Sequence, residues 1–239
     1  MTIQKQIPVL RHISRVVAAS IAAVSLAGAA LADARAEAFV EENAKNVLQT
    51  LSSPDLTSAE RTSVFSDYMN QFADIPRVAR FAVGRYGRQM SAEEFDAYFE
   101  AFTEYAMAVY EVQLDQYRGE TINVTGSIDL KPGDVVVKSQ IPDMDTGDVL
   151  NIEWRVRRDK NNPDAYKVLD VAVNLEGSQI WLAQEQRAQF VAILDRANGD
   201  VNELINRIHG MTQKLRESEE AGVETRFGDL DADAEGEAG

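Results

Sequence analysis

Length, composition and charge narrow what this chain can be: it has 239 residues, 24 of them basic and 39 acidic, a net charge of −15 and no cysteine. The acidic balance argues against nucleic acid as a partner, because binding phosphate groups requires basic side chains. The chain is long enough for one substantial hydrophobic core without disulfides, so a small disulfide-stapled domain is excluded.

The N-terminus has the three parts of a signal peptide. Positive side chains come first, at Lys5, Arg11 and Arg15. An apolar run over residues 16–31 follows, and Ala30-Leu31-Ala32 has the small-x-small pattern that signal peptidase cleaves. We therefore predict a signal peptide over residues 1–32 and export of the rest of the chain.

Two other readings of this segment stay open. Small residues also flank Asp33 and Arg35, so cuts after Ala34 or Ala36 fit the same pattern. The segment could also be an uncut membrane anchor, although its apolar run is shorter than the ~20 residues that a spanning helix needs.

The first folded segments are predicted to be amphipathic helices. Apolar side chains over residues 36–51 fall on one face of a 3.6-residue repeat. Thr57 with Glu60, and Ser91 with Glu94, have the spacing of capping boxes and mark the starts of two further helices.

The longest predicted helix spans residues 92–117 and is unusually aromatic. One stripe carries Phe95, Phe99 and Phe102, and tyrosines at 98 and 105 widen it beyond the ~100° face that one packing partner covers. Such a helix needs apolar neighbours on more than one side. It is either a central core helix or one wall of a cavity.

Four β-rich runs follow, separated by short turn-forming sequences. They span residues 121–128, 134–141, 149–158 and 166–174. Connections this short join antiparallel neighbours. In the third run Ile152 and Trp154 alternate with Glu153 and Arg155, so one face of the sheet is apolar and the other is solvated.

Helices return over residues 181–197 and from Val201 onward. Helices, then strands, then helices predict an α+β fold with one domain over residues 33–216. We expect an antiparallel sheet of about four strands, covered on one face by helices, with an apolar cavity between sheet and helices. From Glu217 to Gly239 acidic residues dominate, which predicts a disordered tail.

Residues suited to catalysis are few. Of the two histidines, His12 lies in the predicted signal peptide, which leaves His209 alone. No nucleophile motif, phosphate-binding glycine loop or metal-ligand spacing is present, so we predict a protein that is not an enzyme and has no cofactor or metal. The alternatives are an exported hydrolase that uses His209 or a carboxylate pair such as Glu153 and Asp170, and a module that docks through its acidic surface. Strand alternation favours the solvated face for both carboxylates.

An ordered series of residues, from about Asp33 to Leu215, is similar to a known family. It comprises Ala82-Val83-Gly84-Arg85-Tyr86-Gly87-Arg88-Gln89-Met90-Ser91, then Phe95, Tyr98, Phe99, Phe102, Tyr105, Tyr110, Leu114, Tyr117 and Gly119, then Lys167-Val168-Leu169-Asp170-Val171, Glu176-Gly177-Ser178, Gln186-Arg187 and Phe190. This series resembles the MlaC family, the toluene-tolerance or periplasmic phospholipid-transport proteins. Gly87 departs from the family pattern, where a bulky aromatic is common, and a valine usual after the Glu-Gly pair is missing.

The resemblance implies a monomeric periplasmic carrier of phospholipid. Such a protein exchanges lipid with an outer-membrane lipoprotein complex and an inner-membrane ABC transporter complex, and so maintains outer-membrane lipid asymmetry. A related class handles hopanoids, and a hopanoid carrier remains an alternative. Two acyl chains in water carry an unfavourable free energy on the order of 15 to 25 kcal/mol, so a carrier must bury most of their surface.

The residues expected to contact lipid come from the lead-in, the long helix and the sheet. The expected tail contacts are Ile75, Val78, Phe81, Val83, Tyr86, Phe95, Phe99, Phe102, Ala106, Val109, Tyr110, Val137, Ile152, Trp154 and Val171. A head-group phosphate at the mouth is expected to meet Arg77, Arg80, Arg85 and Arg88, unless these four form a solvated helix face.

Overall fold

The protein combines a layer of helices with one antiparallel sheet. The computed structural model describes residues 33–220, except 52, 54, 116–120, 143–148, 161, 163 and 176. The helices are α1 (Ala34–Leu51), α2 (Ser58–Phe72), α3 (Ile75–Ala82), the short 3-10 helix η1 (Tyr86–Arg88), α4 (Ala92–Asp115), α5 (Leu182–Arg196) and α6 (Val201–Glu220). The strands are β1 (Asn123–Lys131), β2 (Asp134–Pro142), β3 (Val149–Arg158), β4 (Tyr166–Leu175) and β5 (Ser178–Trp181).

The sheet has five strands in chain order, β1-β2-β3-β4-β5, and every neighbouring pair is antiparallel. The predicted α+β class and four of these strands are thus confirmed. The fifth, β5, was missed because it is only four residues long and pairs with β4 through the register Ala172↔Trp181. A run of that length is too short to show a clear period of two.

The alternation of apolar and polar side chains along β3 shows which face of the sheet is buried. Ile152 and Val156 are buried, while Arg155 and Arg157 point from the opposite face and bond Asp134. The register Val137↔Trp154↔Val171 places apolar side chains of three strands side by side. The predicted division into an apolar and a polar face therefore holds in the folded protein.

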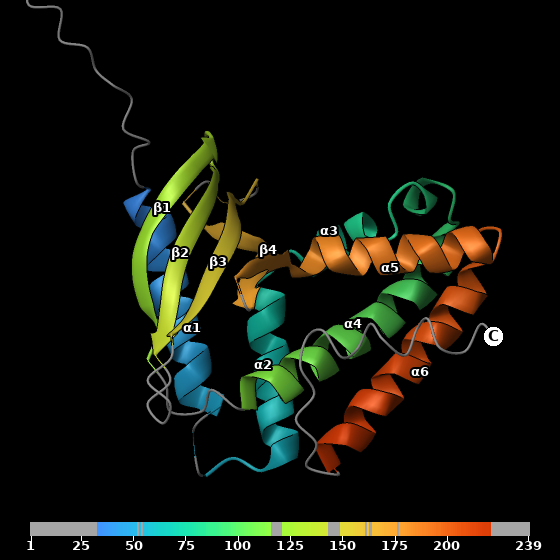
Figure 1. The fold of residues 1–239 in the computed structure, drawn as a ribbon, viewed down its shortest axis with the longest axis horizontal. Coiled ribbons are helices and arrows are strands. Elements are labelled where there is room, and N and C mark those ends of the chain that lie inside the picture. The colour runs from blue at the N-terminus through green and yellow to red at the C-terminus, as the bar shows by residue number, and fades with distance from the viewer. Residues whose placement is uncertain are drawn as a thin grey trace, which may run out of the picture.

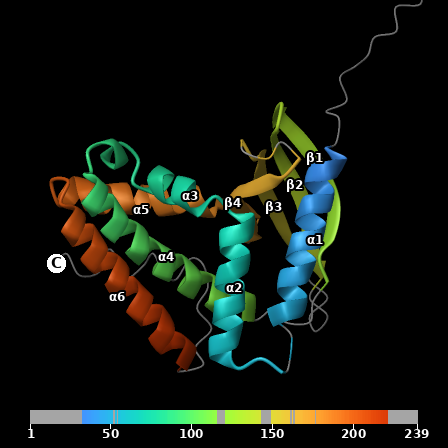
Figure 2. The same ribbon diagram turned by 180° about the vertical axis from the view of Figure 1, so that it is seen from behind.

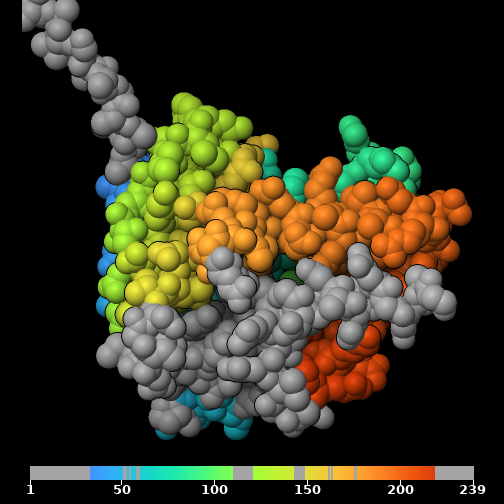
Figure 3. Space-filling model, viewed as in Figure 1, coloured from blue at the N-terminus to red at the C-terminus, as the bar shows by residue number. Residues whose placement is uncertain are grey.

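The helices form two groups beside the sheet (Figure 1). Helix α1 runs along β1 and β2, and α2 stands between α1 and α4, as the view from behind shows (Figure 2). Helices α4 and α6 pack along each other, and α5 packs on α3 and on β4. In the space-filling view α5, in orange, reaches from the edge of the sheet across the helical half of the molecule (Figure 3).

Local capping signals set the helix starts as the sequence predicts. The Thr57 hydroxyl accepts from the Glu60 backbone, and the Glu60 carboxylate accepts from the Thr57 backbone at 2.9 Å. The same reciprocal pair joins Ser91 and Glu94, at 2.8 Å and 3.1 Å. These bonds satisfy backbone donors that a helix leaves unpaired at its start.

The broad apolar surface of α4 is explained by its neighbours. Phe190 of α5 is fully buried, and its ring meets Tyr98 and Phe102 edge-on, with centroids 6.1 and 6.3 Å apart. The Tyr98 hydroxyl donates to the Ala79 carbonyl of α3 at 2.9 Å. The first half of α4 is therefore a core helix surrounded by α3, α5 and α6.

The C-terminal boundary differs slightly from the prediction. Helix α6 continues to Glu220, so residues 217–220 are helical although the sequence placed them in the disordered tail. The helix gains this turn because Leu215, one turn earlier, is fully buried and anchors it. The predicted tail from 221 onward lies outside the described residues. No helix of the described chain combines the length and apolarity of a bilayer-crossing segment.

Candidate ligand-binding cavity

A cavity of about 400 Å³ lies between the sheet and the helices. The sheet contributes Ile141, Ile152, Trp154, Val171 and Val173, and α1 and α2 supply much of the facing wall, including Phe39, Val40, Ala44, Val47, Leu48, Phe65, Met69 and Phe72. The stretch of α4 from Phe102 to Val109 adds Phe102, Tyr105, Ala106 and Val109. Ligand sites of small molecules are typically apolar hollows of this size.

The polar groups of the cavity are few and gather mostly at one corner. Asp170 of β4 and three residues near the start of α5, Glu185, Gln186 and Gln189, form that corner, and Asn43 of α1 lies elsewhere in the wall. No lysine, arginine or histidine is among the described lining residues. The Trp154 ring nitrogen donates to the Ser139 hydroxyl at 2.8 Å, so its polar atom is satisfied within the sheet. The cavity can therefore accommodate an apolar body with one polar end.

The structure brings eight of the predicted tail-contact residues to this cavity. They are Ile75, Val78, Phe102, Ala106, Val109, Ile152, Trp154 and Val171. They come from two helices, α3 and α4, and from two strands, β3 and β4. Their role in binding stays a prediction.

Six other predicted tail-contact residues are not among the lining residues, and the side chain of Tyr110 lies outside the described part. Phe95 and Phe99 stack on each other in the first half of α4, where the Arg80 guanidinium lies 3.8 Å from the Phe95 ring centre. Val83 and Tyr86 are buried in the connection from α3 to α4. The reason is that the first turns of α4 pack in the helical core, and only the stretch from Phe102 to Val109 lines the cavity.

The remaining two are Phe81 and Val137. Phe81 is 41% exposed at the end of α3, beneath the Arg187 guanidinium. Val137 is fully buried, but it packs with Ala36 and Val40 of α1 and is not among the lining residues. Its register neighbour Trp154 reaches the cavity instead, because the longer indole extends further from the strand.

The four arginines predicted at the head group line no part of the cavity. Arg85 bonds Asp195 at 2.7 Å and the Tyr86 hydroxyl at 3.1 Å. Arg80 donates to the Gly87 carbonyl at 3.2 Å, and Arg77 lies 3.9 Å from Asp74. Arg77 and Arg80 belong to α3, Arg88 belongs to η1, and Arg85 directly precedes η1.

Sequence reasoning missed most of the wall made by α1 and α2. The apolar face of residues 36–51 was visible as a helical repeat, but a repeat does not tell a core from a cavity. In the structure Ala36 packs on β2 and does not line the cavity. Val40 packs on β2 and also lines the cavity, and the next turns of the same face, from Ala44 to Leu48, continue the wall.

Asp170 is the buried ionisable group of the polar corner. Its side chain accepts the backbone N–H of Val171 at 2.9 Å and that of Ala183, in the first turn of α5, at 2.8 Å. Burial raises the pKa of Asp170 to about 6, against the two N–H donors and the charge of Arg155, which lower it. The prediction that Asp170 lies on a solvated face is wrong, because α5 begins beside it and only 9% of the residue is exposed.

Replacing Asp170 with asparagine is expected to remove a pH dependence of stability. Because the pKa is raised in the folded state, the stabilisation from Asp170 is complete below about 3.9 and is lost as the pH rises through about 6. Relative to D170N, the wild type should gain about 1 kcal/mol in the free energy of unfolding between pH 7.5 and pH 5. Urea unfolding at both pH values measures this difference. An identical pH dependence in the two proteins would contradict the raised pKa.

Among the described residues, the side chains considered for a hydrolase do not come together in a catalytic site. His209 lies in a shallow groove of α4 and α6, beside Glu104 and Thr212. The Thr212 hydroxyl donates to the Ile208 carbonyl at 2.9 Å, so it is engaged within its own helix. Glu153 pairs with Lys138 at 3.4 Å, and the Asp170 carboxyl caps α5.

Comparisons with known proteins identify a family and a solved structure that are similar to this chain. The model of the family described as MlaC protein matches residues 41–209. A phospholipid-binding protein from Ralstonia solanacearum, whose structure was solved in complex with a phospholipid, superposes with a TM-score of 0.64 at 24% sequence identity. The match covers 76% of this chain and 98% of that one, so the two share a fold. No curated protein matches significantly. Because the family model spans most of the folded region, the chain belongs to the MlaC family.

Proposed function

We propose that this protein is a phospholipid carrier that holds the acyl chains in the cavity between the sheet and the helices. The observation that carries the proposal is the cavity of about 400 Å³, whose wall is apolar apart from a few polar groups. Burial in such a wall offsets the cost of acyl chains in water, on the order of 15 to 25 kcal/mol for a diacyl lipid. Family membership and the phospholipid complex of the Ralstonia solanacearum protein support the same conclusion.

The lipid would lie with its tails against Phe102, Ala106 and Trp154. Its head group would lie at the polar corner of the cavity beside Gln186 and Gln189, whose amide groups can donate to phosphate oxygens. This orientation follows from transfer energetics, because a polar head group loses hydrogen bonds if it is buried among apolar side chains. The four arginines of α3 and η1 have no part in this arrangement.

Family membership supports a cellular role for this carrier. The carrier would be exported by the signal peptide of residues 1–32 and would work in the periplasm as a monomer. It would take lipid from an outer-membrane lipoprotein complex and deliver it to an inner-membrane ABC transporter complex, or the reverse, and so maintain outer-membrane lipid asymmetry. A net charge of −15 supports a transient encounter with anionic bilayers, because like charges repel.

Native mass spectrometry of the purified protein tests this proposal. We expect a complex with one diacyl phospholipid per chain, and uptake of lipid by delipidated protein from phosphatidylethanolamine–phosphatidylglycerol vesicles. A bound species with the mass of a hopanoid would instead identify a hopanoid as the ligand. Protein that is lipid-free as purified and takes up none from vesicles would overturn the carrier function.

A further inference from the structure

The charged side chains that line the cavity are acidic. Among the described lining residues Asp170 and Glu185 carry a charge, and no lysine or arginine joins them. The other side chains of the polar corner are the amides of Gln186 and Gln189. A phospholipid in this cavity would therefore meet hydrogen-bond donors for its phosphate, but no cation of the described wall to offset the phosphate charge.

Glu185 marks the mouth of the cavity. It is exposed, whereas every other described lining residue is buried or half-buried. Asp170, which caps the start of the same helix, is only 9% exposed. The polar corner thus runs from a buried carboxyl at Asp170 to a solvated carboxylate at Glu185. A head group that stays in contact with water must lie beside Glu185.

Helix α5 presents Glu185 and the two amides side by side. Gln189 lies one turn after Glu185 and Gln186, and side chains three or four residues apart on a helix have Cβ atoms about 5–6 Å apart. The Gln186 amide nitrogen donates to the Gln189 amide oxygen at 3.2 Å, which holds these two side chains together. An amide nitrogen has two N–H groups, so Gln186 keeps one for a phosphate oxygen. Glu185 is then within reach of a group attached to that phosphate.

The arginines near these carboxylates in the helix and in the sheet are bound elsewhere. Arg187 of α5 donates to the Phe81 carbonyl at 3.0 Å, and its guanidinium lies 4.8 Å from the Phe81 ring centre. Arg155, the register partner of Asp170, donates twice to Asp134 at 3.1 Å. Burial raises the pKa of Asp170 to about 6 although the charge of Arg155 lowers it, so this carboxyl is ionised at pH 7.5.

From these observations we infer that the cavity selects phospholipids whose head group carries an ammonium, such as phosphatidylethanolamine, over anionic ones such as phosphatidylglycerol, and that Glu185 makes the selection. The amides of Gln186 and Gln189 bind the phosphate, and the Glu185 carboxylate binds the ammonium at the other end of the ethanolamine. A zwitterionic head group brings its own cation, whereas phosphatidylglycerol places an uncompensated phosphate beside the carboxylates of Glu185 and Asp170. The inference deepens the proposed carrier function and rests on it.

The selection is expected to be modest, because the mouth of the cavity is solvated. Water weakens the attraction between exposed charges, and salt screens it further. Wild-type protein should take up about fivefold more phosphatidylethanolamine than phosphatidylglycerol with the same acyl chains at low salt. The ratio should fall toward one in high salt, and a ratio that does not change with salt would contradict selection by charge.

Competition between two lipids in the same vesicle tests the selection. Delipidated protein is incubated with vesicles of equimolar phosphatidylethanolamine and phosphatidylglycerol and is then separated from them. The bound lipids are extracted and quantified by mass spectrometry. EDTA in the buffer removes divalent cations that could bridge a carboxylate and a phosphate. Because both lipids lie in one bilayer, repulsion between the acidic protein and that bilayer affects the uptake of both equally.

Glu185→Gln should lower the uptake ratio to below about twofold, and Glu185→Lys should reverse it. Glu41→Gln is the matched control, because Glu41 is an exposed carboxylate of α1 that does not line the cavity. It removes the same charge from the protein and should leave the ratio as in the wild type. Thermal midpoints confirm that the variants are folded.

Two results would overturn the inference and leave the carrier function intact. One is equal uptake of the two lipids by the wild type, and the other is a wild-type ratio in Glu185→Gln. Uptake of neither lipid by any of the folded proteins is a different result, and it would contradict the carrier function itself.

Discussion

Ala106→Trp is expected to reduce bound phospholipid at least tenfold while the protein stays folded. Ala106 lies on the half of α4 that faces the cavity, and its small side chain leaves open space there. An indole at this position would occupy the volume that acyl chains need, and it would bury its own apolar surface against the same wall. Lipid per chain is measured by native mass spectrometry after incubation with vesicles.

The matched control for this variant is Ala97→Trp on the same helix. Ala97 is exposed on α4 and is not a lining residue, so the same change there should leave lipid binding as in the wild type. Far-ultraviolet circular dichroism and the thermal midpoint exclude unfolding in both proteins. Wild-type lipid content in folded Ala106→Trp would place the ligand outside this cavity.

Asp134→Ala is expected to give a large loss of stability while leaving the residues that line the cavity unchanged. Asp134 begins β2, and only 1% of it is exposed. Its carboxylate accepts two bonds from Arg155, both at 3.1 Å, and another from Arg157, and the Lys131 ammonium lies 3.7 Å away. Alanine would leave these cations without their common partner. Breaking a buried ion pair typically costs 3–5 kcal/mol, and because the arginines stay partly exposed we expect about 2–3 kcal/mol here.

The pH dependence of this loss has a definite sign. Burial raises the pKa of Asp134, but the hydrogen bonds and charges of Arg155 and Arg157 outweigh it and lower the pKa. The stabilisation is therefore present above the ordinary carboxyl pKa of about 3.9 and is lost as the pH falls through the lower folded value. Urea unfolding at pH 7 and below pH 4 measures the difference between wild type and variant. Asp129→Ala, an exposed carboxylate of β1, is the control, and an equal effect of both changes would contradict the role of the cluster.

Much of the fold was predictable because its signals are local. The capping boxes at Thr57 and Ser91 are complete within four residues of chain, and the alternation in β3 fixes which side chains share a face. Patterns of this kind depend on helix and strand geometry alone. The strand β5 was not predicted for the same reason, because four residues are too few to show the two-residue alternation of a strand.

The site was predictable only in part, because a cavity depends on what covers a face and not on the face itself. Phe99 and Phe102 are similar side chains on one stripe of α4, yet Phe102 lines the cavity and Phe99 packs against Phe95 at the far end. Periodicity cannot make that distinction, since it carries no information on where the neighbouring elements end.

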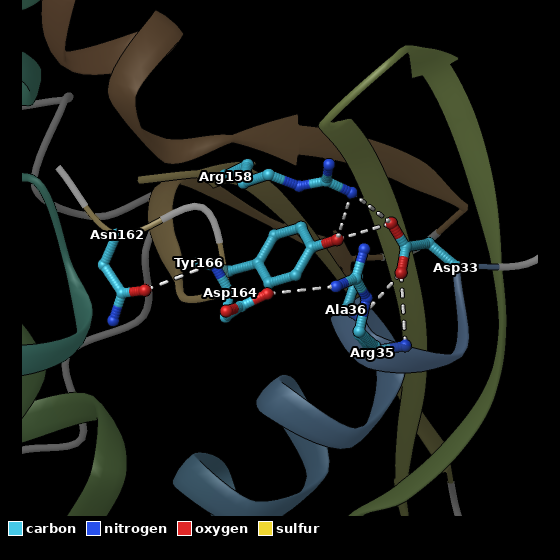
Figure 4. Close-up of polar contacts among 7 residues, drawn as sticks. All are labelled: Asp33, Arg35, Ala36, Arg158, Asn162, Asp164 and Tyr166. Carbon is cyan, nitrogen blue, oxygen red and sulfur yellow. Dashed lines mark hydrogen bonds and ion pairs between the residues drawn. The ribbon is translucent and has the colours of Figure 1, made fainter. Parts of the chain in front are cut away.

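The sequence by itself determined the fold class, most element boundaries, the acidic charge and the resemblance to a lipid-carrying family. Only the tertiary structure decided which half of α4 and which faces of α1 and α2 form the cavity, and that Asp170 is buried under α5. It also brought Asp33 to its partners Ser127 and Tyr166, which are 94 and 133 residues away in the chain. Figure 4 shows Asp33 at the start of α1, with the Tyr166 hydroxyl directed at its carboxylate. Such contacts come from packing between distant segments, and no pattern within a single segment encodes them.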